Sequence, residues 1–231
     1  MTPAEQAELK RVAAENAVES VADGMVLGLG TGSTAALAVD AIGRRVQQGL
    51  KVVAIPTSEA TAAQSRRLGI PLVDFADHAA VDLTIDGADA VDRSNLNLVK
   101  GLGGALLREK IVAAASKRMI VIVDDSKLQG AFGTRCPVPV ETVQFGWQST
   151  ERRLIALGCT TKLRRSAEGQ PVITDGGNYV IDCSFGAIAD AAGLADRIKR
   201  EVGVVETGLF IGLATEVIIA GSNGVEVIRR A

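Results

Sequence analysis

Short apolar runs alternate with helical patterns through the first half of the chain. The apolar runs are Met25–Leu29, Val52–Ile55, Val81–Ile85, Asn95–Val99 and Met119–Val123, and each is followed by a polar loop. This alternation is typical of βαβ units, in which strands form a parallel sheet covered by helices. The carboxyl ends of parallel strands lie on one rim, where ligands bind. We therefore expect five polar loops to meet around one crevice.

The segment before the first apolar run predicts a helix with a defined start. Thr2 is expected to be the N-cap, Pro3 the first helical residue and Glu5 the partner that closes a capping box. The helix is expected to end at Gly24. Its many charged residues exclude a secretory signal peptide, and no run elsewhere predicts a membrane span.

After about Gly130 the pattern changes to that of a small α+β unit. Strands are predicted over Pro137–Val143, Thr160–Leu163, Pro171–Thr174, Tyr179–Ser184 and Val204–Phe210, with helices over Thr150–Leu157 and Ala187–Glu201. The segment Asp175–Asn178 predicts a hairpin turn. Two last strands, over Glu216–Ala220 and Val225–Arg229, are expected to return to the main sheet.

These patterns predict an α/β fold with two parts. Residues 1–130 and 208–231 are expected to form a Rossmann-like parallel sheet flanked by helices. Residues 131–207 are expected to form a small inserted α+β domain.

Composition narrows the class of protein. The chain has 231 residues, of which 47% are hydrophobic and 23% charged, so a large packed core is expected. A formal net charge of −2, with one Trp, one Tyr and five Phe, gives no basic or stacking surface for nucleic acid. Cys136, Cys159 and Cys183 lie far apart, which argues against a disulfide framework or a zinc site and favours a cytoplasmic location.

The stretch Lys100–Lys110 carries the most informative chemistry. Gly103 and Gly104 allow a tight turn close to a ligand, and Lys100 supplies a cation. Glu109 is expected early in a helix. Helical spacing places on its face Ala105, Leu106, Val112, Ala113 and Ser116. Desolvation there would raise the pKa of Glu109 and suit it to general base catalysis, although a structural ion pair is an open alternative.

The loop after the first apolar run, Gly28–Thr34, only partly matches a dinucleotide-binding motif. Ser33 stands where the third glycine would be, and Pro56-Thr57-Ser58 replaces the acidic residue that binds the NAD ribose. The loop also lacks a Walker lysine. It could hold a phosphate through backbone N–H groups, hydroxyls and a helix N-terminus. The alternative is a tight turn in which Ser33 or Thr34 is the helix N-cap.

Several acidic residues gather after the third apolar run. Asp86, Asp89 and Asp92 are like charges whose repulsion must be offset by a cation or ligand, and Lys100 is the obvious partner. A magnesium site is one alternative, and Asx turns are another. A sugar phosphate could instead place its hydroxyls against these carboxylates and its phosphate against the first loop and Lys127.

The single histidine, His78, lies in a polar loop and is interpreted as a surface residue. This makes a Ser–His–Asp triad an unsuitable model for the chemistry. Proton transfer must then fall to carboxylates, lysines or water.

In their order and spacing these segments resemble the type A ribose 5-phosphate isomerases over essentially the whole chain. The segments that carry the resemblance are Gly30-Thr31-Gly32-Ser33-Thr34, Pro56-Thr57-Ser58, Asp86-Gly87-Ala88-Asp89, Lys100–Lys110, Asp125-Ser126-Lys127, Gly177–Asp182 and Val204–Phe210. The resemblance implies a Rossmann-like catalytic domain with a ferredoxin-like lid. It also implies interconversion of ribose 5-phosphate and ribulose 5-phosphate in the non-oxidative pentose phosphate pathway, without metal or cofactor. The implied assembly is a homodimer, possibly a tetramer.

The resemblance also implies roles for individual residues. Glu109 would move a proton between C2 and C1 through an enediol, and Lys100 would stabilise the oxyanion. Asp86 and Asp89 would assist ring opening and hold sugar hydroxyls. Further substrate contacts would come from Thr31, Gly32, Ser33, Thr34, Gly87, Ala88, Gly101, Leu102, Gly103, Lys127 and Lys10. Leu102 departs from the family pattern, which often has glycine there.

Two other functions fit a similar fold. A sugar-phosphate sensor would need an output domain, but the N-terminal region offers one helix and no helix-turn-helix. A coenzyme A transferase would use a glutamate as nucleophile, and Glu109 would then form a thioester.

Overall fold

The computed structural model describes residues 2–129 and 132–230, which form two compact units. The first unit comprises Met1–Ala88, Glu109–Lys127 and Leu213–Ala231, and the second comprises Asp89–Arg108 and Leu128–Gly212. Residues 89–108, 128–129 and 208–212, expected in the first domain, thus belong to the second unit. The expected boundary at residues 130–131 lies outside the described residues.

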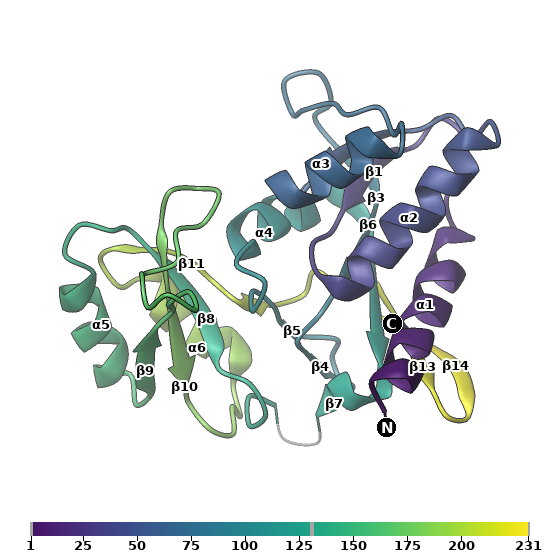
Figure 1. Cartoon of the computed structure of the whole chain (residues 1–231). Helices are drawn as coiled ribbons and strands as arrows, with labels where there is room; N and C mark the ends of the chain where they lie inside the picture. The colour runs from purple at the N-terminus through teal and green to yellow at the C-terminus, as the bar shows by residue number, and fades with distance from the viewer. Residues whose placement is uncertain (1, 130–131, 231) are drawn as a thin grey trace. The chain divides into compact units, whose positions relative to one another are not determined.

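The first unit is built on a six-stranded sheet in the order β14-β13-β6-β3-β1-β2 (Figure 1). Its strands are β1 (Val26–Leu29), β2 (Val53–Pro56), β3 (Val81–Gly87), β6 (Ser116–Asp124), β13 (Glu216–Gly221) and β14 (Gly224–Arg229). All neighbours pair in parallel except β13 and β14, which form an antiparallel hairpin. The predicted parallel sheet and the return of the chain's last two strands to it are confirmed.

Helices pack against this sheet through their buried residues. They are α1 (Pro3–Val18), α2 (Ser33–Gln47), α3 (Glu59–Arg67) and α4 (Leu106–Ala114). Helices α1 and α2 pack together and contact β6, with α1 also on β13 and α2 on β3. Their buried side chains, such as Ala13 and Ile42, share a core with Leu27, Ile120 and Ile218 of the strands. The carboxyl ends of the parallel strands are thereby held in fixed positions.

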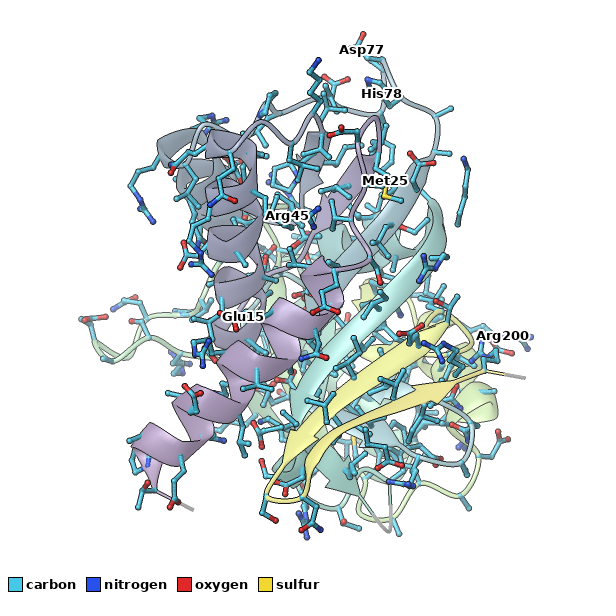
Figure 2. The ribbon with its side chains drawn as sticks, turned by 90° about the vertical axis from the view of Figure 1, so that its right-hand side faces the viewer. Glu15, Met25, Arg45, Asp77, His78 and Arg200 are labelled. Carbon is cyan, nitrogen blue, oxygen red and sulfur yellow. The ribbon has the colours of Figure 1, made fainter. Side chains whose placement is uncertain are left out.

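Helix α1 confirms the predicted start but ends earlier than expected. The Thr2 hydroxyl accepts the Glu5 N–H, and the Glu5 carboxylate accepts the Thr2 N–H, so the capping box is present. The helix ends at Val18, so the expected end at Gly24 is wrong. Arg45, labelled in Figure 2, donates to the carbonyl oxygens of Val18 (2.5 Å) and Val21 (3.0 Å). Satisfying the carbonyl of Val18, the last helical residue, stabilises the early end of the helix.

One predicted rim strand does not join the parallel sheet. Residues Leu98–Val99 form β5, which belongs to a separate sheet in the order β12-β5-β4-β7. Its partners are β12 (Leu209–Phe210), β4 (Ala90–Asp92) and β7 (Leu128–Gln129). The prediction of five rim strands in one sheet is therefore wrong. Residues 86–94 are too few for the crossover of about a dozen residues that a parallel neighbour of β3 would need.

The second unit also contains an antiparallel sheet in the order β11-β8-β10-β9. Its elements are β8 (Val138–Thr142), α5 (Trp147–Ala156), β9 (Thr160–Leu163), β10 (Tyr179–Ser184), α6 (Ala191–Lys199) and β11 (Val204–Thr207). The small α+β unit is confirmed, but the predicted strand over Pro171–Thr174 is not, since only an Arg165–Pro171 bridge forms. The buried carboxylate of Glu141 instead accepts hydrogen bonds from Thr174 and Asn178 and fixes the predicted turn.

Candidate active site

The loop between β1 and α2 turns closely around Asp86. Gly32 has φ of +110°, a left-handed conformation that favours glycine. A Cβ at Gly30 would lie 2.2 Å from Asp86 Oδ1 and 2.6 Å from Asp86 Cα. Both glycines are therefore required by the path of the loop.

We expect Gly30→Ala to destabilise the fold by about 1–3 kcal/mol, because the new methyl group would overlap the Asp86 backbone. The midpoint of urea unfolding should fall accordingly. Gly103→Ala is the matched control for stability, because its Cβ would have no neighbour within 4 Å and Gly103 does not have a positive φ. Equal unfolding midpoints for the two variants would contradict the prediction.

Asp86 is fully buried at the carboxyl end of β3 and is fixed by backbone donors. Its Oδ1 accepts the N–H groups of Thr31 (3.2 Å) and Gly87 (2.7 Å). The strand ends at Gly87, and Ala88 follows it. Asp86 and the first loop, which the sequence predicted to meet, are thus brought together.

The hydroxyl of Thr31 belongs to a cluster with the loop after β2. It lies 2.7 Å from the Thr57 hydroxyl, 2.8 Å from that of Ser58 and 3.2 Å from that of Thr61. Those three residues are buried. The Thr31 side chain therefore stabilises the loop from within, whereas the Ser33 side chain is exposed.

Ser33 and Thr34 open helix α2 and do not cap it. The N-cap is Gly32, which has no side chain, so the alternative in which Ser33 or Thr34 is the N-cap is wrong. Lys10 of α1 donates from Nζ to Ser33 Oγ (3.1 Å). A lysine, two hydroxyls and a helix N-terminus therefore lie together, and this combination suits a phosphate.

Lys127 lies beyond β6, the neighbour of β3 in the sheet. Strand β6 ends at the buried Asp124, whose Oδ1 accepts the Ser126 N–H (3.1 Å). The resulting turn, η1 (Asp125–Lys127), has Lys127 as its last residue. Lys127 thus lies just beyond the carboxyl end of β6, on the same rim of the sheet as Asp86.

Glu109 occupies the first turn of α4 and is only 3% exposed. Four members of its predicted face, Ala105, Leu106, Val112 and Ala113, are buried. The fifth, Ser116, is wrongly placed on the helix, because it begins β6. The Ser116 hydroxyl donates to the carbonyl of Val112 in α4 (2.6 Å).

The second unit holds the glycine loop and Asp89. Asp89 Oδ2 accepts the Leu102 N–H (2.9 Å), so these two predicted site residues meet. Lys100 is 3% exposed, its N–H donates to the Gly208 carbonyl (2.9 Å), and its Nζ lies 5.6 Å from the centroid of the Phe210 ring. Gly101 has φ of +107°, and a Cβ there would lie 2.8 Å from Leu106 Cβ. Gly103 is exposed.

Asp92 forms an Asx turn, which was one of the alternatives for the acidic residues. Its Oδ1 accepts the Ser94 N–H (2.9 Å) and hydroxyl (2.7 Å), which is an Asx turn.

His78 lies in the loop at the top of Figure 2, beside Asp77. Over residues 2–129 and 132–230, no group of three or more His, Cys, Asp or Glu residues could hold a metal ion. Over the same residues, no helix is long and apolar enough to cross a membrane.

Comparison with known proteins identifies the family. Residues 53–224 match the family model of ribose 5-phosphate isomerase A (phosphoriboisomerase A). A ribose-5-phosphate isomerase A from Synechococcus is 55% identical over 225 residues, covering 97% of this chain and 98% of that protein. The chain belongs to the ribose 5-phosphate isomerase A family. A relative with the same name from Gloeobacter violaceus is 57% identical over 95% of each chain.

Solved structures of this family have the same fold. The ribose 5-phosphate isomerase A of Methanocaldococcus jannaschii matches with a TM-score of 0.93 at 39% identity, covering 96% of this chain and 99% of that one. A D-ribose-5-phosphate isomerase in complex with phospho-erythronic acid matches with a TM-score of 0.93 at 36% identity, covering 96% and 98%. The predicted α/β fold with a Rossmann-like sheet and a small lid is confirmed.

One residue that contacts the glycine loop, Arg164, was missed by the sequence analysis. Arg164 donates to the carbonyls of Gly101 and Leu102 and pairs with Asp182. The signal that could have revealed Arg164 was Asp182, a charged residue between the fully buried Ile181 and Cys183 of β10. A charge in such a strand needs a partner.

Proposed function

We propose that the chain interconverts D-ribose 5-phosphate and D-ribulose 5-phosphate through an enediol intermediate, in the non-oxidative pentose phosphate pathway. Membership in the ribose 5-phosphate isomerase A family, at 55% identity over 97% of the chain, is the observation that carries the proposal. In the aldose-to-ketose direction, a proton leaves C2 and one returns to C1, while the hydroxyl proton passes from O2 to O1. Atoms and electrons balance without an added reactant.

Glu109 is proposed as the general base that removes the C2 proton and returns it to C1. Its support is a carboxylate that is 3% exposed in the first turn of a helix. A base shielded from water is more effective in abstracting a proton from carbon. Lys100, also buried, is proposed to stabilise the negative charge that develops on the enediolate oxygen.

Substrate binding is assigned to the remaining residues. Asp86 and Asp89 are proposed to assist ring opening and hold sugar hydroxyls, with Gly87, Ala88 and the loop 101–103 beside them in sequence. The N-terminus of α2, with Ser33 and Thr34, is proposed to bind the phosphate together with Lys10 and Lys127. The Lys10–Ser33 contact of 3.1 Å supports this assignment.

The oligomeric state and the cellular location of the protein are also proposed. A homodimer, possibly a tetramer, follows from the resemblance to the type A isomerases, and sedimentation of the purified protein would test it. A cytoplasmic location is favoured by three free cysteines, of which Cys159 and Cys183 are buried.

The direct test is ribulose 5-phosphate formation from ribose 5-phosphate with and without EDTA. We expect turnover that EDTA does not change, because the proposed chemistry uses side chains alone. Tight binding without turnover would support a sensor instead. Loss of activity in EDTA would make Asp86 and Asp89 metal ligands, and an acyl-CoA thioester on Glu109 would indicate a transferase.

A further inference from the structure

The guanidinium of Arg164 is held in one orientation by Asp182. Arg164 follows β9, and its Nε donates to Asp182 Oδ2 (3.1 Å) while Nη2 donates to Oδ1. The two side chains are only 14% and 18% exposed. A bidentate ion pair of this kind fixes the plane of the guanidinium.

The third nitrogen of Arg164 binds the glycine loop. Nη1 donates to the carbonyl oxygens of Gly101 (2.7 Å) and Leu102 (3.1 Å). These residues lie 63 and 62 positions away in sequence. Two consecutive carbonyls in an irregular loop are therefore turned toward one cation.

Turning the carbonyls toward Arg164 turns the following N–H groups the other way, because the peptides are trans and planar. The Leu102 N–H, which follows the Gly101 carbonyl, donates to Asp89 Oδ2 (2.9 Å). The Gly103 N–H follows the Leu102 carbonyl and must likewise point away from Arg164. Among the described residues it has no hydrogen-bond acceptor, whereas the Gly104 N–H donates to the Gly101 carbonyl (3.0 Å).

We propose that Arg164 is a positioning residue that presents the Gly103 N–H as a hydrogen-bond donor to the enediolate oxygen. Gly103 is exposed, so a substrate oxygen can reach this N–H. Backbone donors fixed before the reaction stabilise developing charge without reorganisation. The inference rests on the proposed isomerase function and adds a donor three residues beyond Lys100 in the same loop.

The main test is Arg164→Lys, which keeps the positive charge but cannot bond to both Asp182 oxygens and two carbonyls. We expect kcat to fall about 10- to 100-fold, since small displacements of catalytic groups cost this much. Phospho-erythronic acid carries a carboxylate where the substrate forms its enediolate, so its inhibition constant should rise. Inhibition by inorganic phosphate should stay the same.

Two further variants keep the test decisive. Arg165→Lys is the matched control, because Arg165 is an exposed neighbour whose guanidinium donates to the Gly169 carbonyl in a surface turn (2.8 Å). It should behave like wild type. If Arg164→Lys does not fold, Arg164→Met with Asp182→Asn removes both charges together and avoids an unpaired buried carboxylate.

The outcomes separate the two proposals. A folded Arg164 variant with wild-type kcat and wild-type inhibition by phospho-erythronic acid would overturn the inference and leave the isomerase function intact. Weaker inhibition by phosphate as well would show that the loop binds the phosphate, which also overturns it. A wild-type protein without isomerase activity would instead reject the proposed function.

Discussion

Replacing Glu109 with glutamine should lower kcat about 10²- to 10⁴-fold while KM stays close to that of the wild type. Glutamine keeps the shape of the side chain but cannot accept the C2 proton at neutral pH. The substrate contacts proposed for other residues are unchanged. Steady-state rates of ribulose 5-phosphate formation would measure both constants.

Glu59→Gln is the matched control for this variant. Glu59 is also a glutamate in the first turn of a helix, α3, but it is exposed. Both substitutions remove the favourable interaction of a negative charge with a helix N-terminus, worth about 0.3–1 kcal/mol. Full activity in the control with loss in Glu109→Gln would assign the effect to proton transfer. A Glu109→Gln variant within tenfold of wild-type kcat would exclude Glu109 as the base.

The burial of Glu109 could be predicted because it depends on local spacing. Residues about one helical turn apart share a face, and the small and apolar residues around Glu109 mark that face as buried. The prediction is wrong for Ser116, which was placed on the helix but lies beyond its end, at the start of β6. Helix ends depend on long-range contacts such as those of Arg45 with Val18 and Val21.

Pairing between distant segments was harder to predict. Asn95–Val99 has the composition of a rim strand, yet Leu98–Val99 pair with Ala90–Val91 and with Leu209–Phe210, which lies more than a hundred residues later. Local apolar patterns carry no information on the partner of a strand. The short connection from β3 was the one usable signal against a parallel neighbour. The contacts of Arg164 were missed for the same reason.

Lys100→Met should lower kcat about 10²- to 10³-fold, the usual cost of removing one donor that stabilises an oxyanion. Methionine retains an unbranched apolar chain of similar length, and it can occupy the buried site beside the Phe210 ring. The backbone bond from the Lys100 N–H to the Gly208 carbonyl should also remain. We therefore expect a folded variant whose KM changes little, because the lost charge acts mainly in the transition state.

Lys117→Met separates this effect from the loss of any lysine. Lys117 is 69% exposed and pairs with Asp82 at 2.8 Å, so its removal should cost at most about 1 kcal/mol of stability and no activity. Inhibition by phospho-erythronic acid should weaken in Lys100→Met and not in Lys117→Met, since Lys100, unlike Lys117, is proposed to face the negative charge of the intermediate. If Lys100→Met raised KM and left kcat intact, Lys100 would bind the ground-state substrate, and the oxyanion would need another source of stabilisation.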